Sequence, residues 1–193
     1  MIRELASVAK RILLVTGKPG SGKTTAILKV AEALKAEGYR IGGMISREVR
    51  EEGTRVGFEI IDLNSYNRGL LAHIGQQIGP RLGKYRVNLN DLNRVGVSAI
   101  LNAIMECDII VIDEIGPMEL FSEPFREAVL KAVESNKLII GVIHWRARDK
   151  LVDKIKSMND AEVFDLTLEN RNDIPKVILK KAKNYLLERK SGT

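Results

Sequence analysis

The chain has 193 residues, of which 45% are hydrophobic and 29% charged, and its formal net charge is +6. This length and balance predict one globular domain over residues 1–193, with a hydrophobic core of its own. The single cysteine, Cys107, excludes an internal disulfide, and residues 1–10 contain no long apolar run. These features exclude a signal peptide and a membrane-spanning helix, and they predict a cytoplasmic protein.

The basic excess is compatible with nucleic acid or with polyanionic small ligands. Lysines gather near the C-terminus, at Lys176, Lys180, Lys181, Lys183 and Lys190. Aromatic residues are only 5% and do not alternate with these charges, as a surface that binds single strands would require. We therefore favour a solvated helix over a nucleic-acid site, and a monomer without membrane contact.

The first half of the chain alternates between strand and helix patterns. An apolar run at residues 11–16 precedes a helical pattern at residues 23–37, which Gly38 ends. Residues 41–50 and 54–63 are two strand patterns that a short polar connection with Gly53 joins, so we expect a hairpin. Residues 64–86, with four glycines and Pro80, are expected to form an irregular loop or insertion.

The second half continues the alternation. We expect strands at residues 84–88, 109–112, 138–143 and 163–166, and helices at residues 91–106, 150–158 and from Asp173 onward. Another helix starts at Ser122 with Pro124 in its first turn, and its core stripe is Phe125, Ala128, Val129, Ala132 and Val133. This order predicts an α/β fold with a mostly parallel sheet and helices on both faces.

One segment matches a phosphate-binding loop at every fixed position of G-x-x-x-x-G-K-[ST]. It reads Gly17, Lys18, Pro19, Gly20, Ser21, Gly22, Lys23 and Thr24, between a predicted strand and a predicted helix. Glycines let backbone N–H groups and the helix N-terminus face a polyphosphate. Lys23 supplies a positive charge between the β and γ phosphates, and Thr24 supplies a hydroxyl to Mg²⁺.

A second motif follows the apolar run at residues 109–112, which ends in Asp113 and Glu114. We expect Asp113 to serve the magnesium ion with Thr24, and Glu114 to orient the water that attacks the γ phosphate. Residues 113–116 also form a D-x-x-G motif, in which Ile115 and Gly116 would adjoin the γ phosphate. No guanine-reading N-K-x-D motif follows, so a guanine-specific switch is excluded and the base preference stays open.

The stretch that runs from Asp113 through Pro117-Met118-Glu119-Leu120-Phe121 is more specific than a general metal-binding strand. Together with residues 47–50, 55–60, 83–87 and 169–172, it resembles a P-loop nucleoside-triphosphatase family first named from thermophiles, which includes a cancer-related nucleoside-triphosphatase. The resemblance runs from Ile12 to Arg171, although the family often has an aromatic residue within the stretch at 44–47.

The resemblance implies a RecA-like sheet in which residues 138–143 lie between the phosphate-loop strand and the strand before Asp113. It also implies Mg²⁺-dependent hydrolysis of ATP, GTP, CTP and UTP, with weaker action on diphosphates.

Three further residues are candidates for the site. His144 ends the strand at 138–143 and could sense the γ phosphate, whereas a solvent-facing strand end is the alternative. Arg171 lies beyond the last strand, where many P-loop proteins place groups near the base. Arg47, with Arg50, Arg146 and Arg148, is a candidate for an arginine that stabilises the transition state; without one, turnover alone should be slow and a partner could supply the group.

Two other functions compete with hydrolysis. A small-molecule or nucleotide kinase would need an acceptor pocket and an arginine-rich lid, for which Arg68, Arg81 and Arg86 are candidates. Glu114 argues against it, because an activated water competes with an acceptor. An RNA-associated regulatory ATPase has only the lysine-rich C-terminal segment in its favour.

Overall fold

The computed structural model describes residues 9–191, with side chains up to Arg189. The part of the N-terminal prediction that concerns residues 1–8, and the side chain of Lys190, lie outside this range. Within it, no helix is long and apolar enough to cross a membrane.

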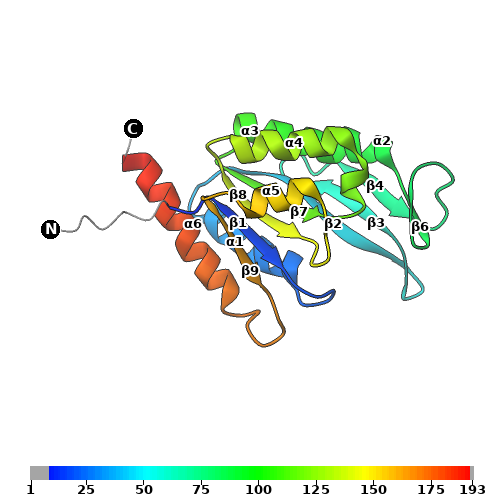
Figure 1. The fold of residues 1–193 in the computed structure, drawn as a ribbon, viewed down its shortest axis with the longest axis horizontal. Helices are drawn as coiled ribbons and strands as arrows, with labels where there is room; N and C mark the ends of the chain where they lie inside the picture. Colours follow the sequence, from blue (N-terminus) through cyan, green and yellow to red (C-terminus); the bar gives the residue numbers. More distant parts are fainter. Residues whose placement is uncertain (1–8, 192–193) are drawn as a thin grey trace.

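The described residues contain one mixed sheet of nine strands in the order β5-β6-β4-β3-β2-β7-β8-β1-β9 (Figure 1). Its parallel part comprises β1 (Ile12–Thr16), β2 (Ile41–Glu51), β7 (Ile109–Ile115), β8 (Leu138–Ile143) and β9 (Ala161–Asp165). The strand β8 lies between β1 and β7, so the predicted RecA-like order is confirmed. All six residues of β8 are buried, because helices cover both faces of this parallel part.

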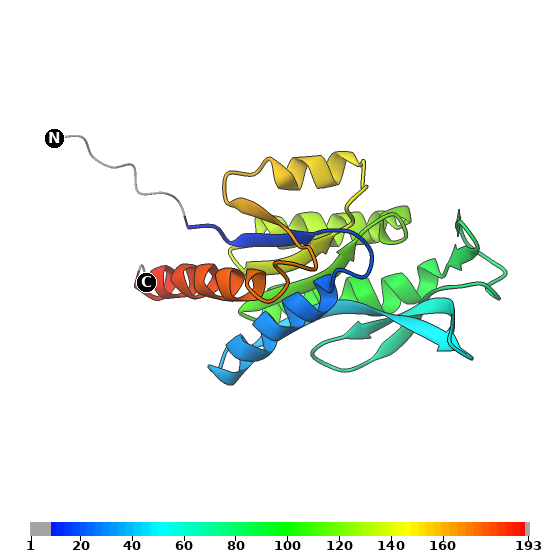
Figure 2. The same ribbon diagram turned by 90° about the horizontal axis from the view of Figure 1, so that it is seen from below.

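Helices cover the two faces of the sheet, as predicted. The helices with their bounds are α1 (Lys23–Ala36), α2 (Leu89–Asp91), α3 (Ser98–Glu106), α4 (Glu123–Glu134), α5 (Lys150–Lys156) and α6 (Ile174–Ser191). One core cluster contains the buried side chains of α3, α4 and α5, and the other contains those of α1 and α6. Figure 2 shows α1 and α6 together on one side of the sheet, away from α5.

The predicted core stripe of α4 is confirmed, since all five of its residues are buried. Its N-cap is Ser122, whose hydroxyl accepts a hydrogen bond from the N–H of Phe125 at 3.1 Å. On α6, Ile178 is buried, whereas Ile174 and Tyr185 are only partly buried. Cys107 is 2% exposed, as expected of an inert thiol, and burial raises its pKa.

The β2–β3 hairpin extends beyond the parallel part of the sheet. Ile45 pairs with Asp113 in the last β2–β7 register position, and residues 46–51 pair only with β3 (Thr54–Asp62). The hairpin therefore stands above the carboxyl ends of the parallel strands, the edge at which α/β proteins bind ligands.

The prediction of an irregular segment at residues 64–86 is wrong for β4 (Arg68–His73), which pairs antiparallel with β3. Two shorter strands, β5 (Arg81–Leu82) and β6 (Tyr85–Val87), extend the sheet further. Pairing with β3 and the burial of Leu71 and Ala72 stabilise β4 despite its glycine. Because β4 contains Gly69 and no β-branched residue, its own sequence gives only a weak strand signal.

The predicted helix at residues 91–106 is divided. A short α2 begins after Asn88, whose side chain accepts a hydrogen bond from the N–H of Asp91. The wider π-helical turn η1 (Leu92–Val97) follows, and then α3. A 3₁₀ turn, η2 (Glu119–Phe121), connects β7 to α4.

Candidate active site

The phosphate loop occupies the turn between β1 and α1. Gly22 lies at φ 97° directly before α1, a left-handed conformation that favours glycine. Gly17 lies at φ 146°, and a Cβ there would come within 2.3 Å of the carbonyl oxygen of Leu166. The loop therefore needs glycine at both positions, and it leaves the first N–H groups of α1 without helical partners. Such a turn is a binding site for an anion.

Lys23 turns its side chain back over this loop. Its ammonium donates to the carbonyl oxygens of Gly17 at 3.0 Å and Lys18 at 3.3 Å. The buried hydroxyl of Ser21 has no hydrogen-bond partner among the described residues. The loop thus presents the positive charge of Lys23 to the cavity, and the Ser21 hydroxyl stays buried within the loop.

Asp113 at the end of β7 is 1% exposed and accepts a hydrogen bond from the hydroxyl of Thr24. Burial raises the pKa of Asp113 to about 7, although Thr24 and Lys23 oppose this shift. Its Oδ2 atom is buried without a partner within the described chain.

An unpaired buried carboxylate oxygen beside a threonine hydroxyl fits a hard cation. Within the described range, no group of three or more acidic, histidine or cysteine side chains could hold a metal ion. Thr24 and Asp113 would therefore share a magnesium ion with phosphate oxygens and water, which is how Mg²⁺ commonly binds in phosphoryl-transfer sites.

Glu114 follows Asp113 and lines the same cavity. Burial raises the pKa of its carboxyl, and the nearby ammonium of Lys23 opposes the shift. A carboxylate that is partly desolvated beside a cation is a suitable proton acceptor near neutral pH. The cavity therefore contains, next to the phosphate loop, a carboxyl group whose chemistry suits a proton acceptor.

The 3₁₀ turn η2 contributes Glu119 to the cavity, a residue that belongs to the family motif but was not predicted as a site residue. It is only 5% exposed, and burial together with Glu114 raises its pKa to about 8. The N–H groups of Gly116 and Glu119 donate to its carboxyl and oppose that shift. A glutamate between Met118 and Leu120, in an otherwise apolar stretch, was the signal that could have revealed it.

A cavity of about 580 Å³ connects the phosphate loop to the hairpin. Among the predicted residues, its lining includes Pro19, Gly20, Gly22, Lys23, Thr24, Asp113, Glu114, His144 and Arg47. Gly17, Lys18 and Ser21 contribute to the loop without lining the cavity, and Ile115 and Gly116 are buried behind it. The structure thus brings together the two motifs that are about 90 residues apart in the sequence.

The remaining candidates lie at different places. His144 is half-buried, and burial, Lys23 and Arg146 lower its pKa, so its neutral form is favoured. Arg171 is exposed in the turn before α6 and does not line the cavity. Its role near the base stays a prediction. The guanidinium of Arg146 lies 4.1 Å from the ring centroid of Trp145.

The arginines that were considered for a lid face other partners. Arg68 pairs with Glu59 at 3.5 Å, and Arg81 and Arg86 donate to the carbonyl oxygens of Gly83 and Gly79. None of the three lines the cavity. The hairpin, rather than the segment at 64–86, adds three charged residues to this cavity: Arg47, Glu48 and Arg55.

A phosphate loop on α1, an acid pair at the end of β7 and the intervening strand β8 define a P-loop nucleoside-triphosphatase. The profile described as NTPase matches residues 12–179. The chain is 46% identical over 169 residues to the nucleoside-triphosphatase THEP1 of Thermofilum pendens, covering 87% of this chain and 93% of that protein. It is 45% identical to THEP1 of Methanosarcina acetivorans, covering 86% and 93%. The chain belongs to the THEP1 nucleoside-triphosphatase family.

Two solved structures of this family are similar to the chain in both fold and sequence. The crystal structure of THEP1 from the hyperthermophile Aquifex aeolicus superposes with a TM-score of 0.77 at 32% identity, covering 87% of this chain and 96% of that chain. The solution structure of a human cancer-related nucleoside triphosphatase gives 0.75 at 36% identity, covering 88% and 96%. The chain is therefore an enzyme that hydrolyses nucleoside triphosphates, and the predicted resemblance is confirmed.

Proposed function

We propose that this enzyme hydrolyses ATP, GTP, CTP and UTP with Mg²⁺, acts more weakly on diphosphates, and uses Glu114 to activate the attacking water. The observation that most directly supports this proposal is the position of Glu114. Its partly desolvated carboxylate lines the same cavity as Lys23. The other residues of the site support this arrangement.

The binding step depends on the loop. Its backbone N–H groups and the N-terminus of α1 face the phosphates, and Lys23 meets the β and γ phosphates. To do so, its ammonium exchanges its hydrogen bonds to Gly17 and Lys18 for phosphate oxygens. This exchange lets Lys23 respond to the ligand with little movement of the backbone.

In the chemical step, the oxygen of a water attacks the γ phosphorus while Glu114 accepts the proton of that water. The bond from the γ phosphorus to the β–γ bridging oxygen breaks, and a diphosphate and orthophosphate leave. A positioned general base contributes about 10² to 10⁴ in rate. Thr24 and Asp113 would hold Mg²⁺, which neutralises charge on the phosphate oxygens when bound.

Broad base selectivity fits the same geometry. The cavity-lining residues of the loop, from Pro19 to Thr25, are suited to phosphate rather than to a base. We therefore infer that the triphosphate supplies most of the binding energy.

The deciding experiment is a phosphate-release panel. Each of the four triphosphates and their diphosphates is incubated with the purified chain in the presence of Mg²⁺ or EDTA. We expect orthophosphate from all four triphosphates, less from the diphosphates, and none with EDTA. Equal release with EDTA would contradict the magnesium site, and release from a single triphosphate would contradict the broad selectivity.

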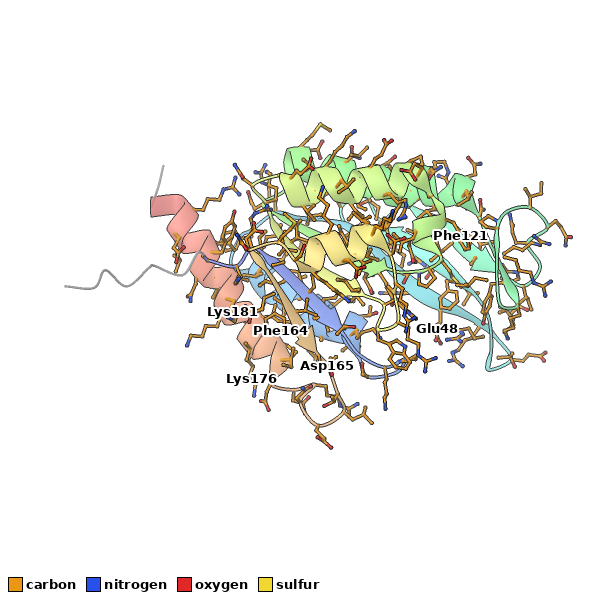
Figure 3. All side chains as sticks on the ribbon, viewed as in Figure 1. Glu48, Phe121, Phe164, Asp165, Lys176 and Lys181 are labelled. Carbon is orange, nitrogen blue, oxygen red and sulfur yellow. The ribbon has the colours of Figure 1, made fainter. Side chains whose placement is uncertain are left out.

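We also infer that the chain acts as a single-domain monomer in the cytoplasm and without nucleic acid. The buried, unpaired thiol of Cys107 supports a reducing compartment. Lysines of α6 are neutralised by acids: Lys181 lies 2.9 Å from Glu162 and Lys183 lies 2.5 Å from Glu37. Figure 3 shows Lys176 and Lys181 on the side of the molecule away from Glu48 of the hairpin. Sedimentation and a salt titration of RNA binding test these two points.

A further inference from the structure

The cavity of about 580 Å³ has two kinds of lining. The phosphate loop, Asp113 and Glu114 contribute one part, and the hairpin with the strands beside it contributes another. Cavities of this size hold small organic ligands. If the γ phosphate lies at Lys23 and Glu114 and the other phosphates lie along the loop, the part of the cavity that the hairpin lines is available to a second ligand.

That space has an apolar floor. Phe58 of β3, Leu71 of β4, Leu82 of β5 and Met118 of the turn after β7 line it. The ring of Phe58 is fixed edge-on by Tyr85, with the ring centroids 5.3 Å apart at 67°. Four elements thus supply one surface that suits a flat ring.

The rim of the same space carries a matched pair of charges. Arg55 donates to Glu48 at 2.7 Å, and its guanidinium lies 5.2 Å from the centroid of the Phe58 ring. Arg55 and Arg50 lower the pKa of Glu48, so it is ionised. A donor and an acceptor side by side above an aromatic floor suit a heterocycle that has both kinds of group on its edge.

We propose that this half of the cavity binds a nucleoside as a second substrate, and that the enzyme transfers the γ phosphoryl group to its primary hydroxyl. The inference rests on the proposed placement of the γ phosphate at Lys23 and Glu114. Glu114 lines the same cavity as the loop and the hairpin floor, so a hydroxyl bound in this cavity would reach the same base as a water does.

Phosphoryl transfer to the hydroxyl breaks the same bond as hydrolysis does. The oxygen of the hydroxyl forms a bond to the γ phosphorus, its proton passes to Glu114, and the bond to the β–γ bridging oxygen breaks. The products are a phosphomonoester and a nucleoside diphosphate. A carboxylate that accepts a hydroxyl proton is the usual arrangement in kinases. The sequence-based objection to transfer therefore holds only while water occupies the space under the hairpin.

The test uses the purified full chain, Mg²⁺ and ATP labelled at the γ phosphate. Adenosine, guanosine, cytidine, uridine and thymidine are added one at a time, and products are separated by thin-layer chromatography. We expect a labelled nucleoside monophosphate from at least one of them, with a smaller share of free phosphate. Only orthophosphate with all five nucleosides, at an unchanged rate, overturns the proposal while leaving hydrolysis intact. The absence of any phosphate release contradicts the proposed hydrolysis as well.

A pair of variants locates the site. Leu82→Trp fills the floor of the space, whereas Ile78→Trp makes the same kind of enlargement at a position that is 81% exposed and outside the cavity. We expect Leu82→Trp to lower transfer by about 10²-fold, the cost of a misplaced acceptor. Ile78→Trp should leave transfer unchanged. If Leu82→Trp instead weakens the binding of ATP itself, the hairpin space holds the base of the triphosphate, and the proposal is wrong.

Discussion

Glu114 and Glu119 approach the same glycine from two sides. A Cβ on Gly116 would lie 2.9 Å from Oε1 of Glu114 and 3.1 Å from Oε2 of Glu119. The turn that follows β7 therefore has no room for a side chain between the two acids. This closeness links the backbone of the turn to the position of the proposed base.

Replacing Gly116 with alanine should displace the carboxyl ends of both acids, because flexible side chains shift more easily than backbone. We expect the fold to persist, nucleotide affinity to stay within about twofold, and kcat to fall by about tenfold to 10²-fold. Steady-state kinetics and thermal unfolding measure these effects. Gly75→Ala is the matched control, since its new Cβ would also meet only a side chain, that of His73. Equal kcat in the two variants would exclude a positioning role for the turn.

Glu114→Gln keeps the shape of the side chain and removes its ability to accept a proton. Because burial already disfavours the charge of Glu114, the variant should fold at least as stably as the wild type. We expect a fall of about 10² to 10⁴ in single-turnover phosphate release, with nucleotide affinity retained. Glu127→Gln, on an exposed position of α4, is the control. Normal turnover of Glu114→Gln would refute the assignment of the base.

The parallel half of the fold could be predicted from the sequence because its signals are local. The unbroken apolar runs of β7 and β8, the stripe of α4 and the glycine pattern of the loop each depend on nearby residues. In the antiparallel half, the β2–β3 hairpin and the strand β6 were predicted as well, whereas β4 was not, because it has a glycine and no β-branched residue. The π-helical turn at Leu92–Val97 likewise has no sequence periodicity that separates it from an α-helix.

The site likewise contains residues that a local sequence motif identifies and residues that only the fold brings to the cavity. A contiguous motif identifies Lys23 and Thr24, and an apolar strand that ends in acids identifies Asp113 and Glu114. Glu119 and Arg55 enter the cavity through tertiary structure, one from a 3₁₀ turn and the other from the extended hairpin.

Glu119 should make the stability of the nucleotide-free protein depend on pH. Its pKa is about 8 in the folded state, compared with an ordinary value of 4.5. Between these values the folded state keeps a proton that the unfolded state has lost, so stability falls as the pH rises. Each unit of pH in this window costs up to about 1.4 kcal/mol for such a group.

Glu119→Gln removes this titration and retains an oxygen that can accept the N–H of Gly116. We therefore expect the variant to gain stability relative to the wild type as the pH rises from 5 to 8, and to differ little below pH 5. Urea unfolding at a series of pH values measures the difference. A constant difference over the whole range would show that Glu119 is ionised in the folded protein, contrary to the effect of its burial.

Arg47 lines the cavity from the β2 strand, and no acid among the described residues pairs with it. Its neighbour Arg50 is paired with Glu48 at 2.6 Å and does not line the cavity. If Arg47 stabilises the charge of the transition state, Arg47→Ala should lower kcat by up to about 10³-fold while changing nucleotide affinity little. Arg50→Ala is the matched control, because it removes the same charge from the same strand. Single-turnover hydrolysis measures both variants. Equal losses would indicate that only the overall positive potential of the hairpin matters, and an unaffected Arg47→Ala would exclude Arg47 as the arginine that stabilises the transition state.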